Sequence, residues 1–277
     1  MNSSRFIIRY AFILLSAIAV TGVSAQDNKA NSEFVPSVGQ KGKDVVWVPT
    51  PTELVKTMLD IAKVTSSDFL IDLGSGDGRT VIEAAKRGAH AVGIEFNPDM
   101  VDISTKSAKR EGVSDKTEFL NMDLFEYDLS KATVITMFLL PELNLKLRPR
   151  ILDLKPGTRI VSNTFTMGEW EADYEVTTED NWNSWNNALM WIVPAKVDGT
   201  WKLGQADLEL TQDFQMVRGT YNNGSKKAAI LDGKLHGDTI NFSINGDKYT
   251  GLVKANAMKG TVTNTSKGNK SDWSATR

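Results

Sequence analysis

The feature that most restricts the fold of this chain is a glycine-rich turn between an apolar run and a helical pattern. The turn covers residues 72–78 and reads Asp-Leu-Gly-Ser-Gly-Asp-Gly. The apolar run before it is 69–71, and the helical pattern after it covers 79–87. Glycine adopts positive φ without strain and lets a ligand approach the backbone where a Cβ would intrude. The turn therefore predicts a strand–loop–helix unit that holds a nucleotide-like ligand.

Acidic residues around this turn indicate the charge of the ligand. Asp72 opens the turn, Asp77 lies near its end, and Arg79 stands where a dinucleotide-binding G-x-G-x-x-G fingerprint has its third glycine. A pyrophosphate needs a helix N-terminus without competing negative charge. An anionic loop suits a cationic ligand without phosphate, and S-adenosylmethionine carries an ammonium and a sulfonium group. We therefore expect S-adenosylmethionine as the cofactor and disfavour a nicotinamide dinucleotide.

The next two apolar runs also end in acidic residues. Residues 89–94 are followed by Glu95, and residues 118–122 are followed by Asp123. In folds of this kind, an acid at the end of the second strand, roughly 20 residues after the first glycine, binds ribose hydroxyls. Asp123 is placed to meet the adenine ring or its exocyclic amine. Three acids that each close a predicted strand favour one cofactor site at one edge of a sheet.

Strands and helices alternate over the central part of the chain. Such alternation predicts an α/β fold with a doubly wound, mostly parallel sheet, to which residues 188–193 add a last, antiparallel strand. At the start of this region, residues 50–53 predict a helix with Thr50 as its N-cap and Glu53 completing a capping box. The predicted strands are 68–73, 89–95, 117–122, 132–140 and 159–165, and the predicted helices are 79–87, 98–111 and 142–154.

Several short motifs in this region carry a family resemblance, beyond the glycine turn itself. They are Val-Pro-Thr-Pro at 48–51, Val-Gly-Ile-Glu at 92–95, Phe-Leu-Leu-Pro at 138–141, Leu-Lys-Pro-Gly-Thr-Arg at 154–159 and Met-Gly-Glu-Trp at 167–170. With these motifs, residues 44–193 resemble a class I S-adenosylmethionine-dependent methyltransferase (a Rossmann-like fold). More narrowly, they resemble the group that includes the ATP synthase c-subunit lysine methyltransferase and its bacterial relatives. The resemblance implies methyl transfer to an acceptor, above all a protein lysine, and hence a protein substrate.

The resemblance also assigns the site residues. It implies that Thr50 closes over the methionine end of the cofactor, and that the acceptor pocket lies beyond the fourth strand. Residues 138–142 are expected at the floor of that pocket, with Pro141 and Glu142 as the catalytic candidates. Glu142 has two interpretations, as a group that holds or deprotonates the acceptor amine or as the first-turn acid of the following helix. The residues expected to bind the cofactor are Thr50, Asp72, Gly74, Ser75, Gly76, Gly78, Glu95 and Asp123.

Composition excludes several other chemistries. The chain has no cysteine, which removes thiolate nucleophiles, disulfides and thiolate metal sites, and its two histidines do not suggest a metal or catalytic pair, so we expect no metal. The net charge of −2 provides no global field for a nucleic acid, and none is expected as a partner. Four tryptophans are candidates for an aromatic wall of the acceptor channel, although ordinary packing is favoured for the last of them: Trp170, Trp182, Trp185 and Trp191.

The two ends of the chain differ from its centre. Residues 1–25 begin with basic residues, continue with an apolar run and end in small residues that resemble a cleavage site. This pattern predicts a secretory signal peptide or, if uncleaved, an N-terminal anchor near a membrane. Residues 26–43 are expected to be a linker and 44–195 the methyltransferase domain. Residues 201–277 gain Asn-Gly and Asp-Gly turns at 223, 232 and 245, which predict a small antiparallel β-barrel or sandwich. The expected protein is thus exported or anchored.

Three alternatives remain open from the sequence. The first is a methyltransferase that acts on a small molecule, a lipid or RNA, because groups of this fold differ in their acceptors. The second is a non-catalytic binding module of the cell envelope, with the β-rich domain as its functional part. A nicotinamide enzyme is the third and is disfavoured by the acids around the glycine turn.

Overall fold

The computed structural model describes residues 34–179 and 185–277. The predicted signal peptide or anchor, residues 26–33 of the predicted linker and Trp182 therefore lie outside the described residues. Within those two ranges, no helix combines the length and the apolar character that crossing a bilayer requires.

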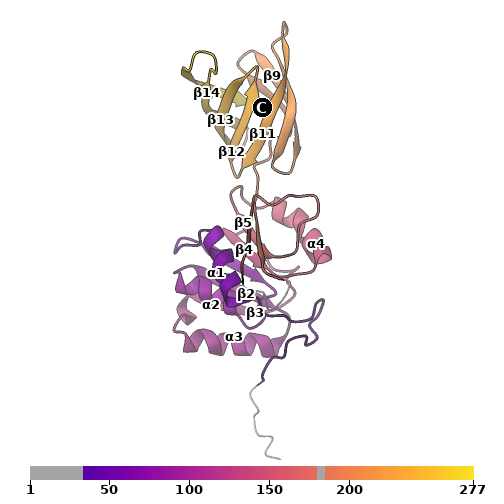
Figure 1. Cartoon of the computed structure of the whole chain (residues 1–277), viewed down its shortest axis with the longest axis vertical. Coiled ribbons are helices and arrows are strands. Elements are labelled where there is room, and N and C mark those ends of the chain that lie inside the picture. The colour runs from indigo at the N-terminus through magenta and orange to yellow at the C-terminus, as the bar shows by residue number, and fades with distance from the viewer. Residues whose placement is uncertain (1–33, 180–184) are drawn as a thin grey trace, which may run out of the picture. The chain divides into compact units, whose positions relative to one another are not determined.

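The first part of the described chain is a seven-stranded sheet with the strand order β3-β2-β1-β4-β5-β7-β6 (Figure 1). The first five strands are parallel, and β7 and β6 are antiparallel to their neighbours. This arrangement confirms the predicted doubly wound, mostly parallel sheet. The strands are β1 (Phe69–Leu73), β2 (His90–Glu95), β3 (Thr117–Asn121), β4 (Val134–Met137), β5 (Arg159–Asn163), β6 (Tyr174–Thr177) and β7 (Asn187–Ile192). The helices are α1 (Thr52–Ile61), α2 (Arg79–Lys86), α3 (Pro98–Arg110) and α4 (Pro141–Leu152), with a short 3₁₀ turn η1 (Ser114–Lys116).

The sheet is covered on both faces, which explains its long apolar runs. Every residue of β4 is buried, as expected of a parallel strand with helices on both sides. Alternate residues enter different core clusters: Ile71 and Ile135 lie in one, and Leu70 and Val134 lie in the other. Because β1, β2, β3 and β4 run parallel, their carboxyl ends meet at one edge, where the glycine turn begins.

Two local predictions are wrong. Helix α1 begins at Thr52 with Pro51 as its N-cap and has no side-chain cap, so Thr50 does not cap it. Instead, the Thr50 hydroxyl accepts a hydrogen bond from Asn163 Nδ2 at 3.3 Å. Asp232-Gly233 does not form a hairpin turn, because it lies inside β11 at a shift in register between Leu231 and Lys234. Asp232 has φ +53° there, so the same local signal marks a bulge.

The C-terminal part is a closed antiparallel barrel with the strand order β10-β11-β12-β13-β14-β15-β8-β9. The predicted barrel is therefore present, and its closure excludes the sandwich alternative. Two predicted turns are found between strands, at Asn223-Gly224 and Asn245-Gly246. The strands are β8 (Gly199–Leu203), β9 (Ala206–Asp213), β10 (Met216–Asn222), β11 (Lys227–His236), β12 (Thr239–Ile244), β13 (Asp247–Lys254), β14 (Ala257–Thr263) and β15 (Lys270–Thr276).

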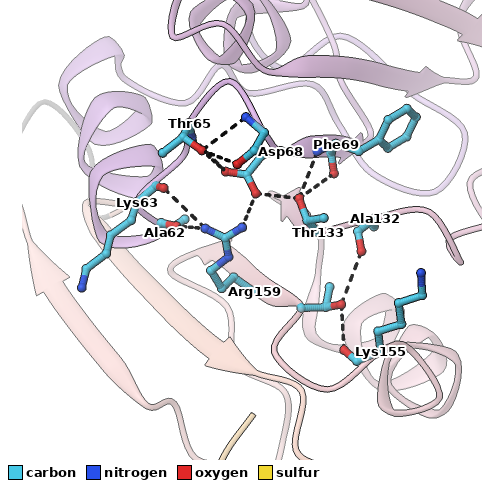
Figure 2. Close-up of polar contacts among 11 residues, drawn as sticks. Ala62, Lys63, Thr65, Asp68, Phe69, Ala132, Thr133, Lys155 and Arg159 are labelled. Atoms are coloured by element: carbon cyan, nitrogen blue, oxygen red, sulfur yellow. Dashed lines mark hydrogen bonds and ion pairs between the residues drawn. The ribbon is translucent and has the colours of Figure 1, made fainter. Parts of the chain in front are cut away.

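A buried ion pair ties the amino ends of the strands together, at the edge opposite the glycine turn. Arg159 at the start of β5 donates to a carboxylate oxygen of Asp68, to which Thr133 Oγ1 also donates at 2.7 Å (Figure 2). The Thr65 amide donates to the other oxygen of Asp68 at 2.8 Å. Burial alone would raise the pKa of Asp68, but these hydrogen bonds and the charge of Arg159 hold it below its usual value. The cluster supports the sheet rather than the site.

Candidate active site

An open cavity lies at the carboxyl edge of the parallel strands. The space between its walls and its open mouth amounts to about 1390 Å³. The cavity lies where ligands bind in open α/β sheets, outside the carboxyl ends of the strands. The predicted site residues that line it are Thr50, Asp72, Gly74, Ser75, Gly76, Glu95 and Asp123, whereas Gly78, Pro141 and Glu142 do not.

The glycine turn has the backbone geometry that its sequence predicts. Gly74, Gly76 and Gly78 have φ values of +77°, +52° and +79°, which a residue with a Cβ rarely adopts. A Cβ on Gly76 would lie 2.5 Å from Trp47 Nε1, and one on Gly78 would lie 2.7 Å from the ring of Phe119. Gly76, which lines the cavity, thus allows the Trp47 side chain to lie against the turn. Gly78, which does not line the cavity, allows the Phe119 ring to pack against the turn.

Strand β2 holds the turn in place through hydrogen bonds. The amides of Gly74 and Ser75 both donate to the Ile94 carbonyl, at 2.9 and 3.0 Å. The Gly76 amide donates to Glu95 Oε2 at 2.9 Å, and the Asn97 amide donates to Glu95 Oε1 at 2.9 Å. Each oxygen of Glu95 keeps a further lone pair for a ribose hydroxyl. Glu95 therefore orders the loop and still faces the cavity.

Asp72 is the most perturbed acid of the site. It is only 6 % exposed, and Thr136 Oγ1 donates to its Oδ1 at 2.7 Å. Burial raises the pKa of Asp72 to about 7, with contributions from the nearby charges of Asp77 and Glu95, although the Thr136 hydrogen bond opposes the shift. No ion pair joins Asp72 to a base among residues 34–179 and 185–277. A cationic ligand in the cavity would supply that missing charge.

Asp77, by contrast, is neutralised locally. Its carboxylate receives Arg79 Nε at 2.9 Å and Arg79 Nη2 at 2.5 Å. Arg79 also donates from Nη1 to the Thr50 carbonyl at 2.9 Å. The arginine at the position of the missing third glycine therefore joins the loop to the segment before α1.

The end of the predicted linker contributes to the cavity. Residues 40–43 of that linker line the cavity together with residues 44–50, the start of the predicted methyltransferase domain. Within the linker, Lys43 forms an ion pair with Asp123, and its ammonium lies 4.9 Å from the ring centre of Phe96. The hydrogen bonds from Lys43 and from the Phe125 amide lower the pKa of Asp123 below its usual value. The acid predicted to meet adenine is thus paired with a lysine that sequence analysis did not single out. Phe96 was also missed, although its place directly after Glu95 was a usable signal.

A group of aromatic side chains also lines the cavity. The rings of Phe138 and Phe165 are stacked, 5.9 Å apart between centroids, and Trp185 meets Phe138 edge-on at 5.8 Å. All three line the same cavity as the glycine turn. Pro141 and Glu142 lie at the first turn of α4, where Glu142 is exposed. The catalytic role predicted for these two residues stays a prediction, and the aromatic group is the better-placed acceptor wall.

A strained turn positions Phe165. Thr164 has φ +60°, an uncommon conformation for a β-branched residue and one that gathers at functional sites. Its amide donates to the Asn187 carbonyl at 2.8 Å, and its hydroxyl donates to Asn163 Oδ1 at 2.9 Å. Asn144 Nδ2 on α4 donates to the Phe165 carbonyl at 3.2 Å. These contacts hold the backbone that presents Phe165 to Phe138.

The tryptophans predicted as a channel wall divide into two groups. Trp185 lines the cavity. Trp170 and Trp191 are both fully buried in the core, and Trp191 Nε1 donates to the Trp170 carbonyl at 2.6 Å. Core packing, the interpretation favoured for Trp191, therefore also applies to Trp170.

The residues of the cavity fit S-adenosylmethionine. The unpaired carboxylates of Asp72 and Glu95 suit a cation, the glycines leave the backbone open, and the buried hydroxyl of Ser75 has no partner within the described chain. Because acidic and aromatic residues line one cavity, the arrangement can align a methyl donor and an acceptor and exclude water between them.

Comparisons with known proteins agree with this geometry. The model of the ANTKMT methyltransferase domain matches residues 72–174. A protein-lysine N-methyltransferase from Saccharolobus islandicus is 42% identical over 139 residues, which are 49% of this chain and 86% of that protein. The ATP synthase c-subunit lysine N-methyltransferase of Xenopus laevis is 35% identical over 129 residues, which are 46% of this chain and 57% of that protein.

One solved structure is similar in both sequence and fold. It is described as an RNA methyltransferase from Salinibacter ruber in complex with S-adenosyl-L-homocysteine. It is 47% identical, has a TM-score of 0.51, and the match covers 54% of this chain and 96% of that one. The relatives therefore share the cofactor chemistry, and their names differ in the acceptor.

Proposed function

We propose that this chain, which belongs to the family of S-adenosylmethionine-dependent methyltransferases that contains the Saccharolobus islandicus enzyme, methylates a lysine amine of a protein. The observation that carries the acceptor is the aromatic group of Phe138, Phe165 and Trp185, because it lines the same cavity as the glycine turn. Aromatic faces attract the ammonium group of a lysine and pack along its methylene stem. The names of the lysine-specific relatives support the same acceptor.

The chain's own residues prepare both partners of the reaction. When bound, S-adenosylmethionine supplies an electrophilic methyl group on a sulfonium. Asp72 and Glu95 balance the positive charge of that cofactor, and the buried setting of Asp72 strengthens the interaction. The aromatic wall removes water from the acceptor ammonium, which lowers its pKa and releases a proton to solvent. The neutral amine then has the lone pair that methyl transfer needs.

Isotope transfer tests the acceptor. The purified chain is incubated with tritiated S-adenosylmethionine and a cell lysate, and the labelled products are divided between protease and nuclease digestion. Label that protease releases, with lysines that gain about 14 Da per methyl group in mass spectra, is the expected result. Asp72→Asn serves as the cofactor-site variant, and Asp115→Asn, at an exposed position of η1, serves as the matched control.

RNA is the competing acceptor, because the Salinibacter ruber protein is described as an RNA methyltransferase. The aromatic rings that suit a lysine stem also suit a stacked base. Label that nuclease releases and protease leaves intact would replace the lysine proposal by this one. The absence of any label, together with an absence of heat on titration with S-adenosylmethionine, would instead favour a non-catalytic binding module.

We further propose that the chain is exported or anchored at a membrane. The charged start, apolar middle and small-residue exit of residues 1–25 support this location. Fractionation of cells that produce the full chain, followed by sequencing of the amino terminus of the recovered protein, tests it. A cytosolic product that still begins at Met1 would contradict the proposal.

A further inference from the structure

The last sixty residues of the chain are basic, although the whole chain is weakly acidic. Residues 218–277 contain ten lysines and arginines against four aspartates, whereas the net charge of the chain is −2. Four of these lysines lie on neighbouring strands of the barrel, and their side chains are exposed: Lys248, Lys254, Lys259 and Lys270. This cluster of exposed lysines on neighbouring strands is a candidate binding surface for an anionic partner.

Strand register places the four lysines on one face. Lys248 on β13 pairs with Thr263 on β14, which in turn pairs with Lys270 on β15. A second row runs from Leu252 on β13 to Lys259 on β14. Neighbouring strands lie about 4.8 Å apart, and positions two residues apart along a strand are separated by about 6.8 Å. The four ammonium groups therefore project from a patch roughly 10–20 Å across.

The opposite side of these strands explains why the lysines must face outward. Val253, Met258 and Trp273, from β13, β14 and β15, are buried in the barrel core. Since side chains alternate between the two faces of a strand, residues such as Lys254 and Lys259 point to solvent. Apolar side chains of these strands thus pack in the barrel interior, and their outer surface is the side available to a partner.

This surface contains little to neutralise the lysines. Asp272 on β15 is the acid at its outward positions, and none of the four lysines forms an ion pair with a described residue. Small polar side chains fill most of the remaining outward positions of β12–β15: Thr239, Asn241, Ser243, Thr250, Thr261, Thr263, Ser274 and Thr276. The outward positions of β12–β15 thus present unpaired positive charge among short polar side chains.

Two large apolar side chains are exposed beside the lysines. Leu252 is 46 % exposed and lies directly opposite Lys259. Leu231 on β11 is 56 % exposed and pairs with Ser243, which itself pairs with Lys248. Leucines beside lysines can contact a membrane as an interfacial amphipathic helix does, with apolar groups in the acyl boundary and cations at the headgroups.

We propose that this lysine–leucine face, comprising Leu231, Lys248, Leu252, Lys254, Lys259 and Lys270, binds an anionic lipid bilayer. A nucleic acid fits it less well, because the outward positions of β12–β15 carry no arginine and no aromatic side chain for phosphate forks or base stacking. The diffuse charge of lysines suits a surface of headgroups that need no fixed geometry. This inference does not depend on which acceptor the enzyme methylates.

Vesicle sedimentation with the full chain tests the proposal. The vesicles consist of phosphatidylcholine alone, or of equal parts of phosphatidylcholine and phosphatidylglycerol. The test variant carries Lys248→Gln, Lys254→Gln, Lys259→Gln and Lys270→Gln. The matched control loses the same charge from four exposed lysines outside the barrel, through Lys56→Gln, Lys109→Gln, Lys131→Gln and Lys155→Gln. Because both variants keep the N-terminal apolar run, any difference between them comes from the position of the charge.

Each lysine near an anionic membrane strengthens binding about fivefold. The test variant should therefore bind anionic vesicles at least tenfold more weakly than the parent chain, whereas the control should lose much less. Binding of the parent chain should also weaken as salt rises, since screening shortens the reach of these charges. Leu252→Ser should weaken binding without any change of charge.

Three outcomes would overturn the proposal. The first is an equal loss in the test variant and the control, which would mean that overall charge and not this face is responsible. The second is equal binding of the parent chain to neutral and anionic vesicles. The third is retention of the parent chain on an immobilised RNA or on polyglutamate, but not on anionic vesicles, which would assign the face to another class of partner. Unchanged melting temperatures in both variants establish that the barrel is intact.

Discussion

Replacement of Asp72 by asparagine should stabilise the protein and weaken its cofactor binding at the same time. Asp72 is nearly buried, and Thr136 Oγ1 donates to it at 2.7 Å. Asparagine has almost the same shape, and its side-chain oxygen can accept the same hydrogen bond. The substitution therefore removes the charge of Asp72 and little else.

The size of the stability effect follows from the pKa of Asp72, which is raised from 3.8 to about 7. A pKa that rises by one between the unfolded and folded states corresponds to about 1.36 kcal/mol, so the buried charge destabilises the fold by up to about 4 kcal/mol. Below pH 3.8 the carboxyl is protonated in the folded and unfolded states, and this destabilisation is absent. It grows as pH rises from 3.8 to about 7 and is constant above that value. Asp72→Asn should accordingly raise the free energy of unfolding at pH 8 and have little effect at pH 4.

Cofactor binding should change in the opposite direction. A cationic ligand favours the ionised form of Asp72, so its loss should weaken binding of S-adenosylmethionine by about 1–3 kcal/mol. For the same reason, the affinity of the parent chain should fall as pH drops below about 7, and the affinity of the variant should not follow that profile. Glu95 remains in place and provides the residual binding.

Thermal unfolding at pH 4 and pH 8 measures the effect on stability, and calorimetric titration at pH 6 and pH 8 measures the effect on cofactor binding. A gain of 1 kcal/mol raises the melting temperature of a chain of this size by about 2–4 °C. Asp115→Asn, at an exposed position on η1, is the control for loss of a carboxylate. A variant that melts at or below the parent temperature at pH 8 and binds S-adenosylmethionine unchanged would refute the assignment of Asp72.

Three further predictions concern other parts of the structure. Lys43→Met should tighten cofactor binding a few-fold in calorimetric titration, because it frees Asp123 from its ion pair. Asp68→Ala should lower the free energy of unfolding in urea by about 1–3 kcal/mol, because the partly exposed Arg159 and the Thr133 hydroxyl lose their charged hydrogen-bond partner, with cofactor affinity unchanged. Phe165→Ala should reduce methyl transfer by about 2–30-fold, the range of a cation–π contact, while the dissociation constant of the cofactor stays the same.

Each of these predictions has a contrary result. Weaker binding in Lys43→Met, with no effect of Lys41→Met, would show that the lysine contributes to cofactor binding rather than competes with it. Unchanged urea stability of Asp68→Ala would mean that the cluster in Figure 2 contributes nothing net to the fold. Equal losses of cofactor affinity and methyl transfer in Phe165→Ala would place this residue in the cofactor pocket instead of the acceptor wall.

Local patterns in the sequence determined the architecture of the methyltransferase sheet. The signals for β1, the glycine turn and α2 all lie within twenty residues, because backbone conformation and burial period are properties of adjacent positions. The β-prone runs after residue 200 likewise predicted an antiparallel barrel or sandwich. Local signals failed where the same dipeptide is compatible with two structures. Asp-Gly suits both a hairpin turn and a β-bulge, and Asp232-Gly233 forms the bulge, inside β11.

Only the tertiary structure decided which side chains complete the site. Lys43 meets Asp123 across 80 positions of sequence, and Thr50 meets Asn163 across 113. Phe138 follows β4 and Phe165 follows β5, and their rings stack because these two strands are neighbours in the sheet. Such contacts depend on how parallel strands bring their carboxyl ends to one edge of a sheet. The sequence shows which residues follow each strand, but the order of the strands in the sheet decides which of these residues become neighbours.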